Sequence, residues 1–218
     1  MKSTATDQSK KIAQILFDIG AVTFSRSRPF KFDSGILSPV YVDNRILISY
    51  PKQRNIILNY LLVKIKELGK IDVIAGVATA GIPHAAFIAQ KLNLPMVFVR
   101  AKPKDHGKGN QVEGKLRRGQ KVLVIEDLVS TAGSSVRVIE AIRRLGGIVT
   151  DELAIYSHSL KESDRNFKEA KVNFYHLTDT MSAAQVAKEK GFLKDEQIES
   201  ILSWTKDPQS WAKKMGYE

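Results

Sequence analysis

One segment of thirteen residues, 122–134, constrains the fold of this chain more than any other feature. It reads VLVIEDLVSTAGS: an apolar run, two adjacent carboxylates, two further apolar residues and a turn of small residues. The apolar run predicts a strand that is covered on both faces, as the strands of parallel sheets are. The small residues predict a turn into a helix. Because open α/β sheets bind ligands at the carboxyl ends of their strands, we expect Glu126 and Asp127, the acidic pair, to lie at a binding site.

Residues 130–134, here named the phosphate turn, carry little side-chain bulk. Backbone N–H groups can therefore close on an anion there, and the following helix adds the positive end of its dipole. A plainer alternative is that Ser130 or Thr131 only caps the helix, although a cap and an anion use the same donors. The turn lacks the lysine of a nucleotide-binding P-loop, and Gly133 alone does not make a dinucleotide fingerprint.

Composition narrows the class of protein. The chain has 218 residues, of which 43% are hydrophobic, and it contains no cysteine. Disulfides, thiol catalysis and cysteine-ligated zinc are therefore excluded. No apolar run approaches the ~20 residues that span a bilayer. Residues 1–11 are polar and lack the hydrophobic stretch of a signal peptide. We expect a soluble cytoplasmic protein that does not bind membranes.

The formal net charge of +11 fits either a nucleic-acid partner or a polyanionic small substrate. Much of the excess is lysine scattered over predicted helix faces, which is typical of a solvated surface. No basic stretch is rich in the aromatic residues that stack on bases. We therefore expect no nucleic-acid partner.

The spacing of apolar residues predicts strands that alternate with helices. Strands are expected at 71–77, 96–100, 122–126, 148–156 and 172–177. A first helix is expected around Ile12, Ile15, Leu16 and Ile19, ending at Gly20. Further helices are expected over 51–68, from 79–83 to 92, and around Val138, Ile142 and Leu145. The C-terminal part is expected to be helical, with Ile198, Ile201 and Leu202 on one face and with Trp204 and Trp211 packed. This order predicts one doubly wound α/β domain, 1–218, with a mainly parallel sheet and right-handed crossovers.

Two segments interrupt this alternation. Residues 1–50 hold one helix and short extended pieces broken by Pro29, Gly35 and Pro39, and we expect them to form a small lobe, the hood, over the carboxyl edge of the sheet. Residues 101–119 are rich in glycine and basic residues and lack hydrophobic periodicity. A stretch of this length inside a compact domain is typical of a functional lid, so we expect a mobile catalytic loop.

The segment 122–134 resembles the phosphoribosyl pyrophosphate motif of the type I phosphoribosyltransferases. Three further runs, 32–45, 76–83 and 100–114, are similar to orotate phosphoribosyltransferases and follow in the expected order. The resemblance covers most of the chain. It implies a magnesium-dependent transfer of ribose 5-phosphate to a ring nitrogen of orotate, giving orotidine 5′-monophosphate and pyrophosphate. It also implies a homodimer in which loop 101–119 completes the partner's site.

This resemblance assigns roles to residues. Glu126 and Asp127 are expected to hold the ribose hydroxyls, directly or through metal-bound water, and to stabilise positive charge on the ribose. Lys104 and His106 are the other catalytic candidates, because cations that close over the departing pyrophosphate favour the transition state and His106 can donate a proton. The Mg²⁺ ion is expected near the acidic pair, held mainly by substrate and water.

The predicted binding residues fall into two groups. For phosphoribosyl pyrophosphate they are Thr79, Ala80, Arg100, Lys104, His106, Glu126, Asp127, Leu128, Val129, Ser130, Thr131, Ala132, Gly133 and Ser134. For orotate they are Ser130, Tyr41 and Val42. Residues 78–81, here named the second turn, are expected to hold pyrophosphate because they too are small residues between a strand and a helix.

The chain departs from the family pattern at several positions. They are Asp33 where a lysine is usual, Thr79 and Ala80 in place of a Tyr-Lys pair, Ala101 in place of a lysine, and Lys108 in place of an acid. The arginine that binds the orotate carboxylate in the family has no clear counterpart. His158 falls near its place and is left unassigned.

Two alternatives remain open at this point. A purine phosphoribosyltransferase would use the same phosphate turn, but it would lack the Ser-Gly and Ser-Pro pairs at 34–35 and 38–39. A regulator that senses phosphoribosyl pyrophosphate and binds nucleic acid would fit the charge. Such a regulator predicts a recognition helix ahead of the fold, whereas residues 1–50 predict one short helix and broken strands.

Overall fold

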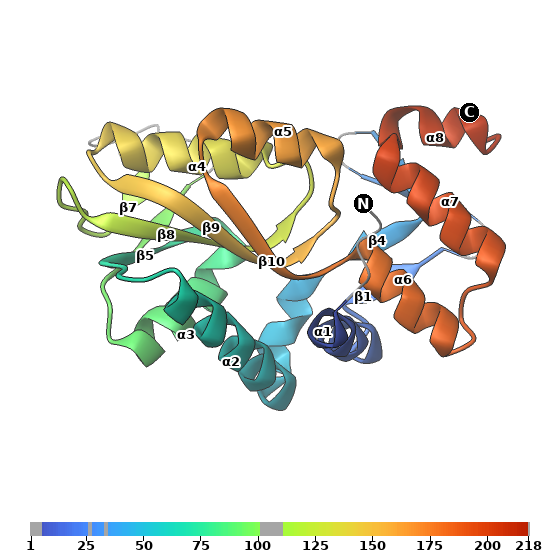
Figure 1. The fold of residues 1–218 in the computed structure, drawn as a ribbon, viewed down its shortest axis with the longest axis horizontal. Coiled ribbons are helices and arrows are strands. Elements are labelled where there is room, and N and C mark those ends of the chain that lie inside the picture. The colour runs from blue at the N-terminus through green and yellow to red at the C-terminus, as the bar shows by residue number, and fades with distance from the viewer. Residues whose placement is uncertain (1–5, 26–27, 33–34, 101–110, 218) are drawn as a thin grey trace.

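A six-stranded sheet forms the centre of the molecule. The computed structural model describes residues 6–25, 28–32, 35–100 and 111–217. The strand order is β10-β9-β8-β5-β6-β7 (Figure 1). The strands are β5 (Val73–Val77), β6 (Met96–Val99), β7 (Val112–Glu113), β8 (Lys121–Val129), β9 (Ile148–Ser157) and β10 (Asn173–Asp179). All neighbours pair in parallel except β7, which is antiparallel to β6. The predicted doubly wound, mainly parallel sheet is confirmed.

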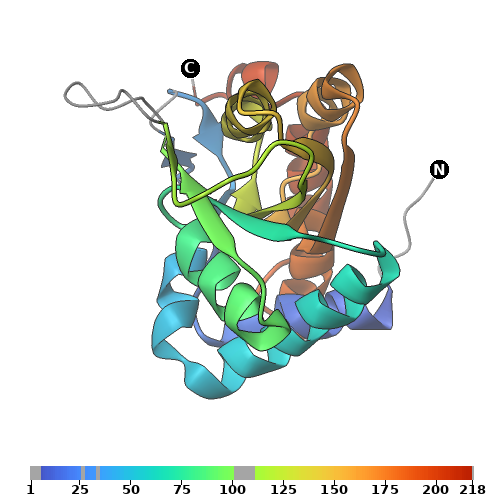
Figure 2. The ribbon, with the colours of Figure 1, turned by 90° about the vertical axis from the view of Figure 1, so that its left-hand side faces the viewer.

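Helices cover both faces of this sheet, as the edge-on view shows (Figure 2). One layer holds α4 (Gly133–Arg144) and α5 (Lys161–Ala170). The opposite layer holds α2 (Pro51–Glu67) and α3 (Gly81–Leu92). The side chains of strand β8 pack against both helix layers, because alternate residues of a strand point to opposite faces of the sheet. Leu123 and Ile125 belong to the hydrophobic core on the α3 side, and Val122 and Val124 to the core on the α4 side.

The remaining elements are not part of the central sheet. They are α1 (Asp7–Asp18), α6 (Thr180–Glu189), α7 (Asp195–Lys206) and α8 (Pro208–Lys214), with the short elements β1 (Val22–Phe24), β2 (Phe30–Lys31), β3 (Leu37–Ser38), β4 (Val40–Val42) and the 3-10 helix η1 (Asn44–Ser49). In the hood, β1 pairs with β4 and β2 pairs with β3, both antiparallel. No helix in the described part of the chain is long and apolar enough to cross a membrane.

Trp204 connects the C-terminal helices to the hood. Its side chain is fully buried, and its indole Nε1–H donates to the carbonyl oxygen of Leu37 over 3.0 Å. The ring packs edge-on against Phe32 and His158. Trp211 is also buried, so the prediction that both tryptophans pack is confirmed. The C-terminal segment therefore fixes the position of the hood.

Strand β8 is longer than the sequence predicts. It runs to Val129, so the acidic pair lies inside the strand and not after it. The reason is the neighbouring strand: β9 pairs with β8 as far as Val129 opposite Ser157, and these backbone hydrogen bonds prolong the strand past the carboxylates. The phosphate turn still begins directly at its end.

Three further expectations need correction. Leu145 is 52% exposed and does not pack in the core, because α4 ends at Arg144. Leu202 is 38% exposed, because its neighbour Ile201 is the residue that α7 buries. The segment 101–119 is not a loop throughout, since 112–113 form β7 at the edge of the sheet. The backbone N–H of Arg100 donates to the carbonyl of Gln111 over 2.9 Å, which continues this pairing. Residues 101–110 lie outside the described residues.

The contact of Trp204 with the hood predicts a large effect on stability. Trp204→Ala is expected to lower the free energy of unfolding by about 3–5 kcal/mol, because it removes a fully buried indole and leaves a cavity. Trp204→Phe keeps a ring but loses the bond to Leu37, and should cost clearly less. Urea denaturation followed by circular dichroism measures both variants. A loss below about 1 kcal/mol for the alanine variant would show that the hood is held by other contacts.

Candidate active site

The acidic pair is buried at the carboxyl end of β8. Glu126 and Asp127 are 6% and 9% exposed, and the Asp127 backbone N–H donates to Glu126 Oε1 over 3.1 Å. Burial raises the pKa of Glu126 well above its usual range, and the neighbouring Asp127 charge raises it further. Burial also raises the pKa of Asp127, but a hydrogen bond from Glu126 and backbone N–H groups oppose this. The pKa of both acids is therefore raised, and the opposing hydrogen bonds favour the ionised form of Asp127 more than that of Glu126.

The start of η1 brings an amide and a cation to this pair. Asn44 is fully buried, and its Nδ2–H donates to the backbone carbonyl of Asp127 over 2.8 Å. The guanidinium of Arg45 is held by both carboxylate oxygens of Asp43, at 2.7 and 2.9 Å. Its charge also helps to lower the pKa of Asp127. No sequence motif assigned a role to Asn44 or Arg45. The only local sequence feature that could have indicated their role is that these polar residues directly follow a short extended apolar segment.

The phosphate turn leads into α4 without a side-chain cap. The N-cap residue is Ala132, whose φ of +66° places it in the left-handed region, and no side chain accepts from the first turn of the helix. The backbone N–H groups there are left open to an anion, which favours the anion site over simple capping. Asn166 on α5 donates through Nδ2 to the carbonyl of Thr131 over 2.8 Å and fixes the turn from outside.

The second turn meets the same end of β8. Helix α3 begins after Ala80, again without a side-chain cap. A Cβ atom at Gly81 would lie 2.6 Å from the Ile125 carbonyl oxygen and 3.3 Å from Glu126 Oε1, so only glycine allows this approach. Thr79 is exposed and Ala80 half-buried. The structure thus brings two helix N-termini without side-chain caps close to the acidic pair on β8.

The cations predicted for the leaving group are placed only in part. Arg100 follows β6 with an exposed side chain, and its Nη1 lies 3.9 Å from Glu113 Oε1. Its position at the carboxyl edge of the sheet agrees with the prediction, because β6 lies beside β5 and the second turn. Lys104 and His106 fall outside the described residues, so their roles stay predictions.

The residues predicted for the base differ in their exposure. Tyr41 is 40% exposed, with its ring 5.6 Å from that of Phe30, whereas Val42 is part of the hydrophobic core. Ser130 is half-buried at the start of the phosphate turn. Contact between these three residues and orotate stays a prediction. The side chain of Val42 already packs inside the hood, which leaves Tyr41 the more accessible of the two hood residues.

His158 is buried beside the hood. Its Nδ1 lies 2.9 Å from Thr180 Oγ1, and its ring stacks on Phe32 and meets Trp204 edge-on. Burial lowers the pKa of His158 to about 4. His158 is therefore neutral at physiological pH and does not replace an arginine as a cation for a carboxylate.

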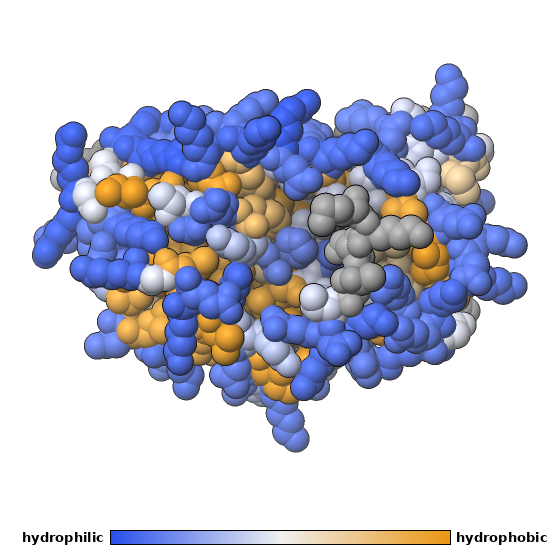
Figure 3. Space-filling model, viewed as in Figure 1, coloured by the Kyte–Doolittle hydropathy of each residue, from blue (hydrophilic) through white to orange (hydrophobic). Residues whose placement is uncertain are grey.

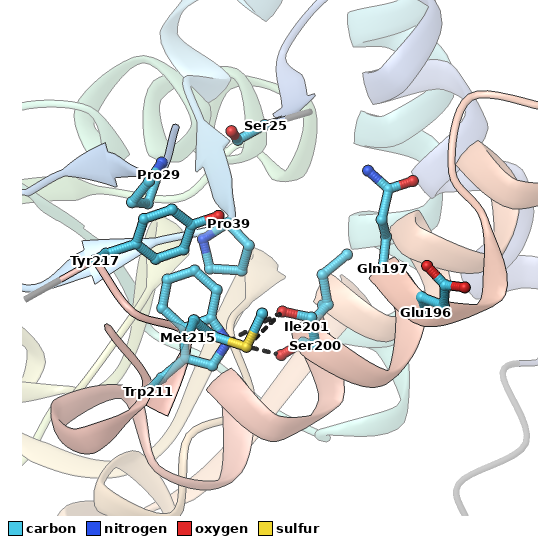
Figure 4. A pocket seen from close by; sticks show the side chains of 10 residues that line it. All are labelled: Ser25, Pro29, Pro39, Glu196, Gln197, Ser200, Ile201, Trp211, Met215 and Tyr217. Carbon is cyan, nitrogen blue, oxygen red and sulfur yellow. Dashed lines mark hydrogen bonds between the residues drawn. The ribbon is translucent and has the colours of Figure 1, made fainter. Parts of the chain in front are cut away.

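A cavity of about 220 Å³ lies apart from these residues, between the hood and the C-terminal helices (Figure 4). It is lined by Ser25, Pro29, Pro39, Glu196, Gln197, Ser200, Ile201, Trp211, Met215 and Tyr217. The Trp211 indole N–H donates to the carbonyl of Ser200, another lining residue, over 3.0 Å. None of the predicted site residues that the structure describes lines this cavity.

The burial of His158 predicts a dependence of stability on acidity. An unfolded histidine with a pKa of 6.5 binds a proton that folded His158 accepts only near pH 4. The free energy of unfolding should therefore fall as pH decreases from about 6.5 to 4, by up to about 3 kcal/mol for one such histidine. His158→Gln should remove this part of the dependence, and the exposed His176→Gln provides the control. Equal slopes for wild type and His158→Gln in denaturation at several pH values would contradict the account.

Comparison with known proteins agrees with this geometry. A family model described as the phosphoribosyl transferase domain matches residues 51–178, more than half of the chain. An orotate phosphoribosyltransferase of Coxiella burnetii is 44% identical over 206 residues, covering 94% of this chain and 99% of that protein. One of Enterococcus faecalis is 46% identical over 209 residues, covering 95% of this chain and 100% of that protein.

Solved structures give the same result. The crystal structure of an orotate phosphoribosyltransferase from Aeropyrum pernix matches with a TM-score of 0.70 and 28% identity, over 84% of this chain and 99% of that one. The structure of Leishmania donovani UMP synthase matches with a TM-score of 0.76 and 25% identity, over 90% of this chain and 42% of that one. An adenine phosphoribosyltransferase from Thermoanaerobacter pseudethanolicus, at 24% identity and a TM-score of 0.54, shares the fold alone. From the family model and the full-length relatives together, the chain belongs to the orotate phosphoribosyltransferase family.

Proposed function

We propose that this chain transfers ribose 5-phosphate from 5-phospho-α-D-ribose 1-diphosphate to a ring nitrogen of orotate, forming orotidine 5′-monophosphate and pyrophosphate in pyrimidine biosynthesis. The observation that carries the proposal is the buried acidic pair at the end of β8, flanked by two helix N-termini that no side chain caps. Relatives named orotate phosphoribosyltransferase, aligned over nearly the whole chain, favour orotate over a purine as the base.

The geometry suggests how the donor binds. The phosphate turn supplies N–H groups and hydroxyls to the 5′-phosphate, and the second turn supplies N–H groups to the pyrophosphate. The acidic pair lies between the two turns and accepts hydrogen bonds from the 2′- and 3′-hydroxyls of the ribose. Three parts of one substrate would thus be held by three consecutive features around β8, with the anomeric carbon facing the hood.

The transfer breaks the bond between the anomeric carbon and a pyrophosphate oxygen, and forms a bond from that carbon to the orotate nitrogen, which gives up its proton. Positive charge develops on the ribose while the old bond breaks. Ionised Asp127 would act through a poorly solvated interior, where its effect on the positive charge of the ribose is stronger than in water. Arg100, with Lys104 and His106, would neutralise the departing pyrophosphate, and His106 would donate a proton to its oxygen.

The acidic pair fits a magnesium ion. Carboxylate oxygens are the ligands that Mg²⁺ prefers, and it usually keeps several waters and is bound through one or two carboxylates and substrate phosphates. Among the described residues, no group of three or more His, Asp or Glu side chains forms a metal site, so substrate and water would complete the coordination. When bound, Mg²⁺ would neutralise charge on the pyrophosphate, with Glu126 and Asp127 holding its waters.

We also propose that two copies of the chain form the active enzyme, with loop 101–119 completing the partner's site. Helix α2 carries apolar side chains on both faces. Ile57 and Leu61 are buried, whereas Ile56 and Val63, seven residues apart on one stripe, are 41% and 56% exposed. Figure 3 shows apolar side chains among charged ones at the lower edge, over α2 and α3. Such a surface is typical of a contact between subunits. A cytoplasmic location stays a prediction.

Sedimentation velocity tests the proposed pairing. The wild-type chain is expected to sediment as a dimer, and Ile56→Lys should shift it toward monomer, because a charge in an apolar contact is unfavourable. Lys66→Glu, a change of surface charge on the same helix, is the control. A monomeric wild type would contradict the proposal, and a dimer unaffected by Ile56→Lys would place the contact elsewhere.

The activity itself is tested by mixing the purified chain with phosphoribosyl pyrophosphate and Mg²⁺ and following the ultraviolet absorbance of orotate. Adenine, hypoxanthine and uracil serve as parallel acceptors. Loss of orotate alone is the expected result. Consumption of a purine would keep the role of the phosphate turn and overturn the assigned base. Tight binding of phosphoribosyl pyrophosphate without any transfer would favour a regulator.

The role of the acidic pair is tested by Asp127→Asn. We expect kcat/KM to fall by about 100-fold or more, since the variant removes the charge that stabilises the transition state. Glu140→Gln, on the exposed side of α4, is the matched control and should behave as wild type. An Asp127→Asn enzyme with near-normal kcat/KM would remove the acidic pair from the mechanism.

A further inference from the structure

Glu152 is a second buried acid close to the active site, and the mechanism above does not use it. It lies on β9 and is fully buried. In the pairing of β8 with β9, Val124 lies opposite Glu152 and Glu126 lies opposite Ala154. Because alternate residues of a strand share a face, Glu126 and Glu152 point to the same side of the sheet. That side is the one covered by α4, since Val124 and Ala154 both belong to the α4-side core.

The carboxyl group of Glu152 meets the helix that follows the phosphate turn. Its Oε1 accepts from Ser135 Oγ over 2.6 Å, and both side chains are buried. Ser135 is the third residue of α4, in the turn whose backbone N–H groups no side chain caps. This hydrogen bond therefore runs from the sheet to the part of the helix that would bind the ribose phosphate. An electrostatic interaction with Glu152 contributes to the raised pKa of Glu126, which places the two acids within electrostatic reach.

Glu152 is unfavourable for stability, so its presence needs another explanation. Its Oε2 atom is buried and has no hydrogen-bond partner among the described residues. Burial raises the pKa of Glu152 to about 8, so the group is mostly neutral at pH 7. Replacing a buried polar pair by apolar residues of similar size is often neutral or stabilising. The residues that follow, Leu153 to Tyr156, are all buried hydrophobics, so an apolar residue would suit this position.

We propose that Glu152 is a positioning residue that, through Ser135, fixes the first turn of α4 against the sheet and so sets the position of the phosphate-binding N–H groups. This inference rests on the proposed binding of the ribose phosphate at the phosphate turn. A neutral acid suits the task, because it accepts from Ser135 without adding negative charge beside the phosphate and the acidic pair. An apolar residue would fill the space but would leave the helix turn free to shift.

The test combines a conservative variant with one that removes both partners. The double variant Ser135→Ala/Glu152→Leu should raise KM for phosphoribosyl pyrophosphate by about tenfold or more, since small displacements of binding groups have large effects. Its KM for orotate should change little and its melting temperature should stay equal or rise. Glu152→Gln keeps an acceptor oxygen and should bring KM back to within about threefold of wild type, a recovery that loss of packing alone does not predict.

A second measurement does not depend on turnover. Calorimetric titration with ribose 5-phosphate should show about tenfold weaker binding to the double variant and near-normal binding to Glu152→Gln. If the double variant does not fold, Ser135→Ala alone carries the test, with the same expected rise in KM. Asn166→Ala removes the side-chain hydrogen bond to the Thr131 carbonyl of the phosphate turn and provides a comparison.

The outcomes separate this inference from the proposed function. Unchanged KM and unchanged ribose 5-phosphate binding in the double variant would overturn the positioning role while leaving the function intact. A lower melting temperature with equal losses for both substrates would also overturn it, because that is the pattern of a merely structural residue. If wild type transfers no ribose phosphate and does not bind ribose 5-phosphate, the proposed function fails, and the inference fails with it.

Discussion

The burial of two neighbouring carboxylates near the end of a central strand is the central physical constraint in this structure. Burial opposes the charge of both Glu126 and Asp127, so neighbouring groups must stabilise them. Asn44 donates to the Asp127 backbone, and the charge of Arg45 favours the ionised form of its side chain. Two helix N-termini, with their positive dipole ends, lie at the same place. An interior of this kind is unfavourable for an empty protein and favourable for one that binds a polyanionic substrate with its cations.

The geometry around this pair depends on contacts between distant parts of the chain. The hood reaches the acidic pair through Asn44, and the C-terminal helices hold the hood through Trp204, which bonds to Leu37. His158, at the end of β9, joins the same aromatic group and bonds to Thr180 at the start of α6. The position of the hood relative to the acidic pair is therefore set by packing from both ends of the chain. Binding and stability share these residues.

Local sequence predicted the strand, turn and helix around 122–134, because an apolar run and a small-residue turn determine their own backbone. It did not predict that β8 continues to Val129, since that depends on pairing with β9. Local sequence also did not predict the roles of Asn44 and Glu152, because their hydrogen-bond partners are distant in the sequence. Asn44 bonds to Asp127, 83 residues away, and Glu152 bonds to Ser135, 17 residues away. The only local feature of Glu152 is that it directly precedes the buried apolar residues Leu153 to Tyr156. Leu145 and Leu202 fit a helical spacing but lie outside the core, because helix ends and neighbouring helices decide which positions are covered.

The central claim is that the phosphate turn beside the acidic pair holds the ribose phosphate. Amide ¹H–¹⁵N chemical shifts recorded during titration with ribose 5-phosphate test it most directly. The account predicts that the largest saturable shifts fall on residues 130–135, with smaller ones at the acidic pair and none along α7 and α8. Shifts concentrated at the second turn or in the hood, with the phosphate turn unchanged, would contradict it.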